Sequence, residues 1–293
     1  MRRPFVIAAI VLGALAPGSS LAAPSARAVI ADPARDARYP TSNKQLLIPS
    51  HGLGMNALLF EASGKGPHAT VILMHGLPGN ERNLDLAQAI RRSGWDVLTF
   101  TYRGAWGSAG DFSIANAMED TQAALDFARS PEAGKLGIDG RHLVLAGHSM
   151  GGATAMMTAA GARGLDGLIL IDAWNIAHGT SKGATTREEL IVGFDDFGNS
   201  LHGATPASVA DEVVAKRAQW DLVAAARRLA HLPILTVTAK YGGALENRPT
   251  TAALRRAGNR RVTAVEMNTD HAFSDHRIAL ASTIVAWLQS LPR

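Results

Sequence analysis

The chain has 293 residues, of which 47% are hydrophobic and 18% are charged, and it contains no cysteine. This length suffices for one large domain with a single core. The absence of cysteine from the sequence excludes disulfides and a thiol nucleophile. Without the two charges of Arg2 and Arg3, the formal net charge of +4 falls to +2, which is too small and too scattered to indicate nucleic-acid binding.

The first 22 residues have the layout of a secretory signal peptide. Two arginines are followed by an apolar run over residues 5–16, and Ser20 and Ala22 are small residues at the −3 and −1 positions of a cleavage site. We therefore expect cleavage after Ala22 and a periplasmic or secreted mature chain. The alternative, an uncleaved anchor, is disfavoured because the run is shorter than the about 20 residues that span a bilayer. No later run is apolar and long enough to cross a membrane.

Residues 23–43 are rich in Pro, Ala, Ser and Arg and predict a loose N-terminal segment, so that the folded domain covers about residues 44–293. Its first elements are two strand-like runs, Leu46–Ser50 and Met55–Glu61. The turn signal His51–Gly54 between them favours an antiparallel hairpin.

From residue 69 onward, apolar strand-like runs alternate with helical patterns. The expected strands are 69–74, 95–102, 142–146, 165–171, 234–239 and 261–267, and the expected helices are 83–93, 114–129, 151–162 and 273–291. This alternation indicates crossover units and a parallel sheet that is covered on both faces. The segment from about residue 173 to 232 breaks the alternation, because it carries helical stretches but no clear strand. We interpret it as an insertion over the sheet.

One strand runs directly into a glycine-rich turn that holds a serine: residues 142–152 read HLVLAGHSMGG. A strand that must turn abruptly into a helix forces its corner residue, Ser149, into a strained conformation. Gly147 and Gly151 leave the space that such a corner needs. The corner would lift the Ser149 hydroxyl to the helix N-terminus, where free N–H groups favour negative charge. A purely structural turn is the alternative.

With these residues the chain resembles the α/β-hydrolase superfamily over about residues 46–291. The motifs that carry the resemblance lie at 75–80, 102–110, 147–152 and 270–277, and the chain looks most like secreted bacterial hydrolases related to the prolyl-oligopeptidase and dienelactone-hydrolase branches. The resemblance implies an α/β fold with a mostly parallel eight-stranded sheet, helices on both faces and a helical lid insertion at about 173–232.

Acyl transfer needs two N–H donors for the oxygen that becomes negative in the transition state. One is expected from Met150, directly after the nucleophile, and the resemblance places the other at Leu77, since Pro78 has no N–H. His75 and His148 are expected to hold loops in place. Tyr102 is expected to pack against its neighbours.

A serine hydroxyl needs a base, and the resemblance implies the chain order serine, acid, histidine. His271 follows the last expected strand and precedes the last helix, which predicts that it lies at the same sheet edge as Ser149. For the acid, Glu246 is preferred because it is the only carboxylate in the loop after strand 234–239. The alternative acid is Asp172, at the end of strand 165–171.

The sequence thus predicts a serine hydrolase that cleaves small-molecule esters, with amides as the alternative substrates, through an acyl-enzyme without cofactor or metal. A prolyl-oligopeptidase-type peptidase is less favoured, because the sequence has no propeller or other large N-terminal domain to gate peptides. A catalytically silent ligand-binding protein on the same fold is the second alternative, motivated by the unusual acid loop. The aromatic residues of the insertion are expected either to line the substrate pocket or to pack the lid: Trp174, Phe194, Phe197 and Trp220.

Overall fold

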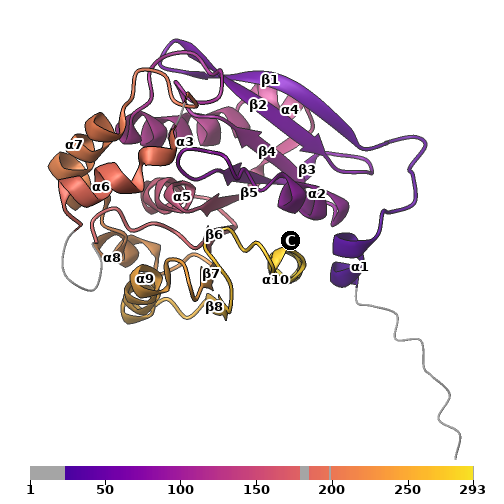
Figure 1. Ribbon diagram of the computed structural model, residues 1–293. Helices are drawn as coiled ribbons and strands as arrows, with labels where there is room; N and C mark the ends of the chain where they lie inside the picture. The colour runs from indigo at the N-terminus through magenta and orange to yellow at the C-terminus, as the bar shows by residue number, and fades with distance from the viewer. Residues whose placement is uncertain (1–23, 179–184, 198, 293) are drawn as a thin grey trace, which may run out of the picture.

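The computed structural model describes residues 24–178, 185–197 and 199–292. The expected signal peptide therefore lies outside the described residues. A single eight-stranded sheet forms the centre of the molecule, and helices cover both of its faces (Figure 1). The fold class that the sequence predicts is confirmed.

The sheet is antiparallel at one edge and parallel elsewhere. Its strand order is β1-β2-β4-β3-β5-β6-β7-β8, in which β1 with β2 and β2 with β4 are antiparallel and all other pairs are parallel. The strands are β1 Ser42–Ser50, β2 Leu53–Glu61, β3 His68–Met74, β4 Asp96–Phe100, β5 Ile138–His148, β6 Gly167–Ile171, β7 Ile234–Ala239 and β8 Val262–Met267.

The hairpin between β1 and β2 has a tighter turn than expected. Ser50 pairs with Leu53, so the loop contains only His51 and Gly52, with φ values of 48° and 79°. Two positive φ values are typical of the two-residue turns whose twist matches that of paired strands. The strand β2 therefore begins inside the segment that the sequence assigned to the turn.

Each sheet face carries its own layer of helices and its own apolar core. The main helices are α1 Pro24–Ile30, α2 Leu84–Arg92, α3 Ile114–Ala128, α4 Pro131–Lys135, α5 Met150–Gly161, α9 Ala244–Arg256 and α10 Arg277–Ser290. One core joins α3, α5 and α9 to the sheet, and the other joins α1, α2 and α10 to the opposite face. No helix in the described part of the chain is long and apolar enough to cross a membrane.

Part of the N-terminal segment that was expected to be loose is a docked helix. The helix α1 lies against α2 and α10, with the Ala28 side chain buried. The guanidinium of Arg92 donates to the carbonyl oxygens of Ala28 (2.6 Å) and Val29 (3.2 Å) at the end of α1. These carbonyls have no partner within the helix, so Arg92 satisfies groups that would otherwise lack a donor.

The segment between β6 and β7 is helical in its described part, as expected. It contains α6 Arg187–Gly193, α7 Pro206–Lys216 and α8 Leu222–Ala225, with short 3-10 turns at Asp195–Phe197, Arg217–Trp220 and Ala226–Leu229. Its path is tied to the loop after β4: the Trp106 N–H donates to Ser200 O (3.0 Å) and the His202 N–H donates to Gly104 O (2.7 Å).

The loop after β4 is itself anchored by a buried carboxylate on α3. Asp120 is fully buried and accepts hydrogen bonds from the Ser50 hydroxyl (2.7 Å), the Arg103 N–H (2.8 Å) and the Arg103 Nε (2.6 Å). Arg103 also bonds the exposed Glu119 (2.6 Å). Asp120 thus joins β1, α3 and the loop that carries Tyr102 and Trp106.

Replacing Asp120 by alanine should lower the free energy of unfolding by about 3–5 kcal/mol, because it removes the buried acceptor of the Ser50 hydroxyl and of the Arg103 N–H and Nε, and leaves Arg103 only its ion pair with the exposed Glu119. Replacing its neighbour Glu119 by glutamine should cost less than about 1 kcal/mol, since exposed ion pairs contribute little. Urea denaturation followed by circular dichroism measures both values. Equal losses for the two variants would contradict this assignment.

Candidate active site

The residues that the sequence singled out lie on loops at one edge of the sheet. Ser149 follows β5, Asp172 follows β6, His271 follows β8, and the segment from His75 to Asn80 follows β3. These strands are parallel, so their carboxyl ends meet at the same edge. The fold therefore gathers four separate segments into one site.

Ser149 occupies the sharp corner that the sequence predicts. Its backbone has φ 55° and ψ −121°, a strained conformation for a residue with a side chain. A Cβ atom at Gly147 would overlap Gly151 O, and one at Gly151 would lie 2.6 Å from the carbonyl oxygens of Met74 and His75. Gly152 is equally confined, because a Cβ there would lie 2.5 Å from the Ala173 Cβ. The three glycines are required by close packing around the corner.

His271 is paired with a buried carboxylate. Its Nδ1 donates to Asp172 Oδ2 at 2.6 Å, and the Asp172 side chain is fully buried while that of His271 is 46% exposed. Asp172 also accepts from the N–H groups of Ala239 (3.0 Å) and Gly243 (2.7 Å). This arrangement fixes the His271 tautomer with its Nε2 unprotonated, which is the state that a general base requires.

The contact favours the alternative acid of the sequence analysis, Asp172, over the preferred Glu246. Asp172 bonds His271, and among the described residues no hydrogen bond joins Glu246 to His271. The sequence placed Glu246 in a loop, but α9 begins at Ala244, so Glu246 lies in its first turn. The shorter loop that remains, residues 240–243, contributes the Gly243 N–H to Asp172 rather than a carboxylate to His271.

Glu246 nevertheless lies close enough to the pair to interact with it electrostatically. Burial and then the Asp172 carboxylate raise the pKa of Glu246 to about 7, while His271 and a hydrogen bond from the Asn175 N–H act in the opposite direction. Glu246 therefore changes its charge near neutral pH, next to the carboxylate that orients His271.

The segment after β3 lies against the Ser149 corner. A Cβ atom at Gly76 would lie 2.9 Å from the Ser149 Cβ, so the backbone before Leu77 lies directly beside the serine. Within the described residues the Leu77 N–H has no hydrogen-bond partner. Met150 is the first residue of α5, where an N–H has no acceptor within the helix. Both predicted oxyanion donors are thus free and flank Ser149.

His148, next to the serine, holds the loop that carries His271. Its Nε2 donates to His271 O (2.8 Å), and the two imidazole rings lie 4.6 Å apart. Burial lowers the pKa of His148 to about 4, so the ring is neutral at pH 7. The loop-holding role predicted for His148 agrees with this contact.

Arg277, which the sequence reasoning missed, supports the same loop from the other side. Its Nη1 donates to Ala272 O (2.9 Å), its Nη2 donates to Asn83 Oδ1 (3.0 Å), and it forms an ion pair with Asp85 on α2. An arginine at the start of the last helix gives no sequence signal for such a role, because two of its partners, Asn83 and Asp85, lie almost two hundred residues earlier.

The Ser149 hydroxyl and His271 are brought to the same edge, but among the described residues no hydrogen bond joins them. The link between their segments runs through His148, which precedes Ser149 and bonds the His271 backbone. Bonds between a nucleophile and its base are often long in the absence of substrate and tighten in the complex.

The aromatic residues of the insertion pack against one another. The Trp174 and Phe194 rings lie 6.0 Å apart and the Phe194 and Phe197 rings are stacked at 5.1 Å, while Trp220 is buried. Phe197 also borders a cavity of about 770 Å³ that extends past Trp106 to Asn80. Of the two uses that the sequence left open for these aromatics, packing accounts for most of them.

No group of three or more His, Cys, Asp or Glu side chains within residues 24–178, 185–197 and 199–292 has the arrangement of a metal site.

Residues 71–283 match the model of the alpha/beta hydrolase family. The chain belongs to this family.

Several solved structures share the fold. An esterase from Pyrobaculum calidifontis is 22% identical, covers 87% of both chains and has a TM-score of 0.66. A thermophilic and thermostable carboxylesterase cloned from a metagenomic library is 20% identical, with 91% of this chain and 94% of that chain covered and a TM-score of 0.63. A 2,6-dihydroxy-pseudo-oxynicotine hydrolase is 18% identical over 87% of this chain and 68% of its own, with a TM-score of 0.62. No curated protein matches the sequence.

The Glu246 environment predicts a pH dependence of stability. Because the folded pKa of about 7 lies above the unfolded value, the contribution of Glu246 to the free energy of unfolding is fully present below about pH 4.5 and is lost as the pH rises through 7. Glu246→Gln removes this pH dependence. The difference in free energy of unfolding between variant and wild type should therefore be about 2 kcal/mol more favourable to the variant at pH 8 than at pH 5, measured by urea denaturation at both pH values. The exposed Glu132→Gln is the control, and an equal change in it would contradict the assignment.

Proposed function

We propose that the chain is a serine hydrolase that cleaves carboxylic esters of small molecules through an acyl-enzyme. The observation that carries the proposal is the buried Asp172–His271 pair at the sheet edge that also holds the strained Ser149 corner. Two of the structural neighbours are an esterase and a carboxylesterase, which supports ester rather than amide substrates.

Each residue has a defined step in this mechanism. The His271 Nε2 takes the Ser149 proton as the hydroxyl oxygen attacks the ester carbonyl, and Asp172 stabilises the imidazolium that forms. The N–H groups of Leu77 and Met150 bind the resulting oxyanion. His271 then protonates the leaving alcohol, and a water activated by the same histidine hydrolyses the acyl-serine. The loss of one oxyanion donor typically costs about 2.7–4 kcal/mol of transition-state stabilisation.

Activity assays with matched variants test the proposal. A fluorophosphonate probe should label the wild-type chain and leave Ser149→Ala unlabelled. Asp172→Asn should lower kcat on p-nitrophenyl esters by on the order of 10⁴, because the histidine loses its tautomer control. Glu246→Gln should change kcat by less than about tenfold, since Glu246 makes no bond to His271.

The outcomes separate the alternatives. A wild-type chain that is not labelled and hydrolyses none of the esters would support the silent binding protein. Faster cleavage of aminoacyl-naphthylamides than of esters would support the peptidase. If Glu246→Gln lowers kcat as much as Asp172→Asn does, Glu246 rather than Asp172 acts as the acid of the triad.

We also propose that the chain is exported and acts in the periplasm or outside the cell. The basic start, the apolar run and the small residues at 20 and 22 support this location. Expression of the full chain and of residues 23–293, followed by cell fractionation and mass determination, tests it. Export and cleavage after Ala22 should occur only for the full chain, and retention of an uncleaved full chain in the cytoplasm would refute the proposal.

A further inference from the structure

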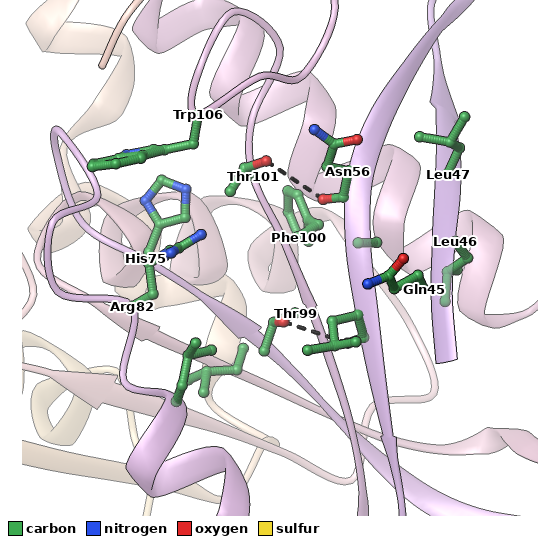
Figure 2. A pocket seen from close by; sticks show the side chains of 14 residues that line it. Gln45, Leu46, Leu47, Asn56, His75, Arg82, Thr99, Phe100, Thr101 and Trp106 are labelled. Atoms are coloured by element: carbon green, nitrogen blue, oxygen red, sulfur yellow. Dashed lines mark hydrogen bonds between the residues drawn. The ribbon is translucent and has the colours of Figure 1, made fainter. Parts of the chain in front are cut away.

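A second cavity lies away from Ser149 and His271, on the face of the sheet beside the β1–β2 hairpin. Its volume is about 550 Å³, and it is bordered by β1, β2, β4, the start of α2 and the Trp106 side chain (Figure 2). Its lining includes five leucines from four elements, β1, β2, β3 and α2, together with polar side chains from β1, β2 and the end of β4. The leucines are Leu46, Leu47, Leu58, Leu73 and Leu84, and the polar residues include Gln45, Asn56, Thr99 and Thr101. Volume and lining are those of a site for a small organic ligand.

His75 lines this cavity with an unsatisfied nitrogen. The side chain is 3% exposed, and its Nδ1 donates to Gly76 O at 2.7 Å. Burial lowers the pKa of His75 to about 4, with a smaller contribution from the Arg82 charge. The ring is therefore neutral at pH 7, and its Nε2 is an acceptor. In the described part of the chain this buried Nε2 has no partner. Buried polar atoms are nearly always bonded, so the missing group is a hydrogen-bond donor.

The positively charged side chain of Arg82 lies beside this acceptor. The Arg82 guanidinium lies over the Trp106 ring, 5.3 Å from its centre, and Figure 2 shows Trp106 above His75 with Arg82 beside it. No ion pair between Arg82 and a carboxylate is found in the residues that the structure describes. The same corner of the cavity therefore offers an acceptor and an unpaired positive charge.

We propose that this cavity binds a medium-chain hydroxy carboxylate, whose hydroxyl donates to His75 Nε2, whose carboxylate pairs with Arg82 and whose chain lies on the leucine wall. A simple fatty acid has only acceptors at its head at pH 7 and leaves the His75 nitrogen unpaired. Because His75 and Arg82 are neighbours, the hydroxyl must be close to the carboxylate, as in a 3-hydroxy acid.

The proposed site does not depend on the proposed ester hydrolysis, because binding of an acid requires no turnover. It shares only the segment after β3 with the candidate active site: the Trp106 Nε1 donates to Pro78 O (2.8 Å), and the Tyr102 hydroxyl donates to His75 O (3.2 Å).

Isothermal titration calorimetry of the full chain with 3-hydroxydecanoate and with decanoate tests the proposal. The two acids differ only in the hydroxyl, so the hydroxy acid should bind about tenfold more tightly, as expected when a buried acceptor gains its donor. Arg82→Gln should weaken both acids by about tenfold at low salt. Arg38→Gln is the matched control: this arginine lies 5.3 Å from the centre of the Tyr39 ring in the same way, but outside the cavity, and it should leave both affinities unchanged.

Two further variants report on the cavity itself. His75→Phe should abolish the difference between the two acids, and Leu58→Trp, which fills the cavity from β2, should weaken both. If His75→Phe does not fold, Leu58→Trp and Arg82→Gln still decide the question. The proposal is overturned if neither acid binds the wild-type chain, if both bind equally, or if binding is unchanged in Arg82→Gln and Leu58→Trp. None of these results depends on whether the chain hydrolyses esters.

Discussion

The buried carboxylate of Asp172 is the interaction on which the candidate site depends. It receives N–H groups from Ala239 and Gly243, the Asn247 amide at 3.5 Å and the His271 imidazole at 2.6 Å. These donors come from the end of β7, the following loop, α9 and the loop after β8. A buried charge is tolerated only when its oxygens are bonded in this way. The same bonds that stabilise Asp172 therefore set the position of three separate loops.

Glycines beside Asp172 explain why the loop after β7 carries no acid. A Cβ atom at Gly242 would overlap Asp172 Oδ2 and lie 2.9 Å from the His271 Cα, and one at Gly243 would lie 3.1 Å from Asp172 Oδ1. The loop passes so close to the carboxylate that only backbone fits there. The loop donates the Gly243 N–H to the acid that follows the neighbouring strand β6, which makes a second acid in the loop unnecessary.

Local stereochemistry decided which parts of the molecule the sequence could predict. The buried strands are apolar runs, and the Ser149 corner needs glycines within two residues, so both leave clear signals along the chain. The helix α9 leaves a weak signal, because its sequence is polar and contains Pro249. Missing that helix placed Glu246 in a loop and made it the preferred acid. The pairing of Asp172 with His271 joins residues 99 positions apart, and no local pattern encodes it.

The segment after β3 joins the two sites of the molecule. On one side Gly76 touches the Ser149 corner, and on the other side His75 faces the cavity beside the β1–β2 hairpin. Trp106 and Tyr102 bond the same few residues, and they belong to the loop that Asp120 anchors through Arg103. A ligand that pairs with His75 would act on the backbone that presents the Leu77 N–H. Coupling between two binding sites is reciprocal. If such a ligand changes the affinity of the candidate active site for a transition-state analogue by some factor, the bound analogue must change the affinity for the ligand by the same factor. The backbone of residues 75–78 is the physical element through which that coupling would pass.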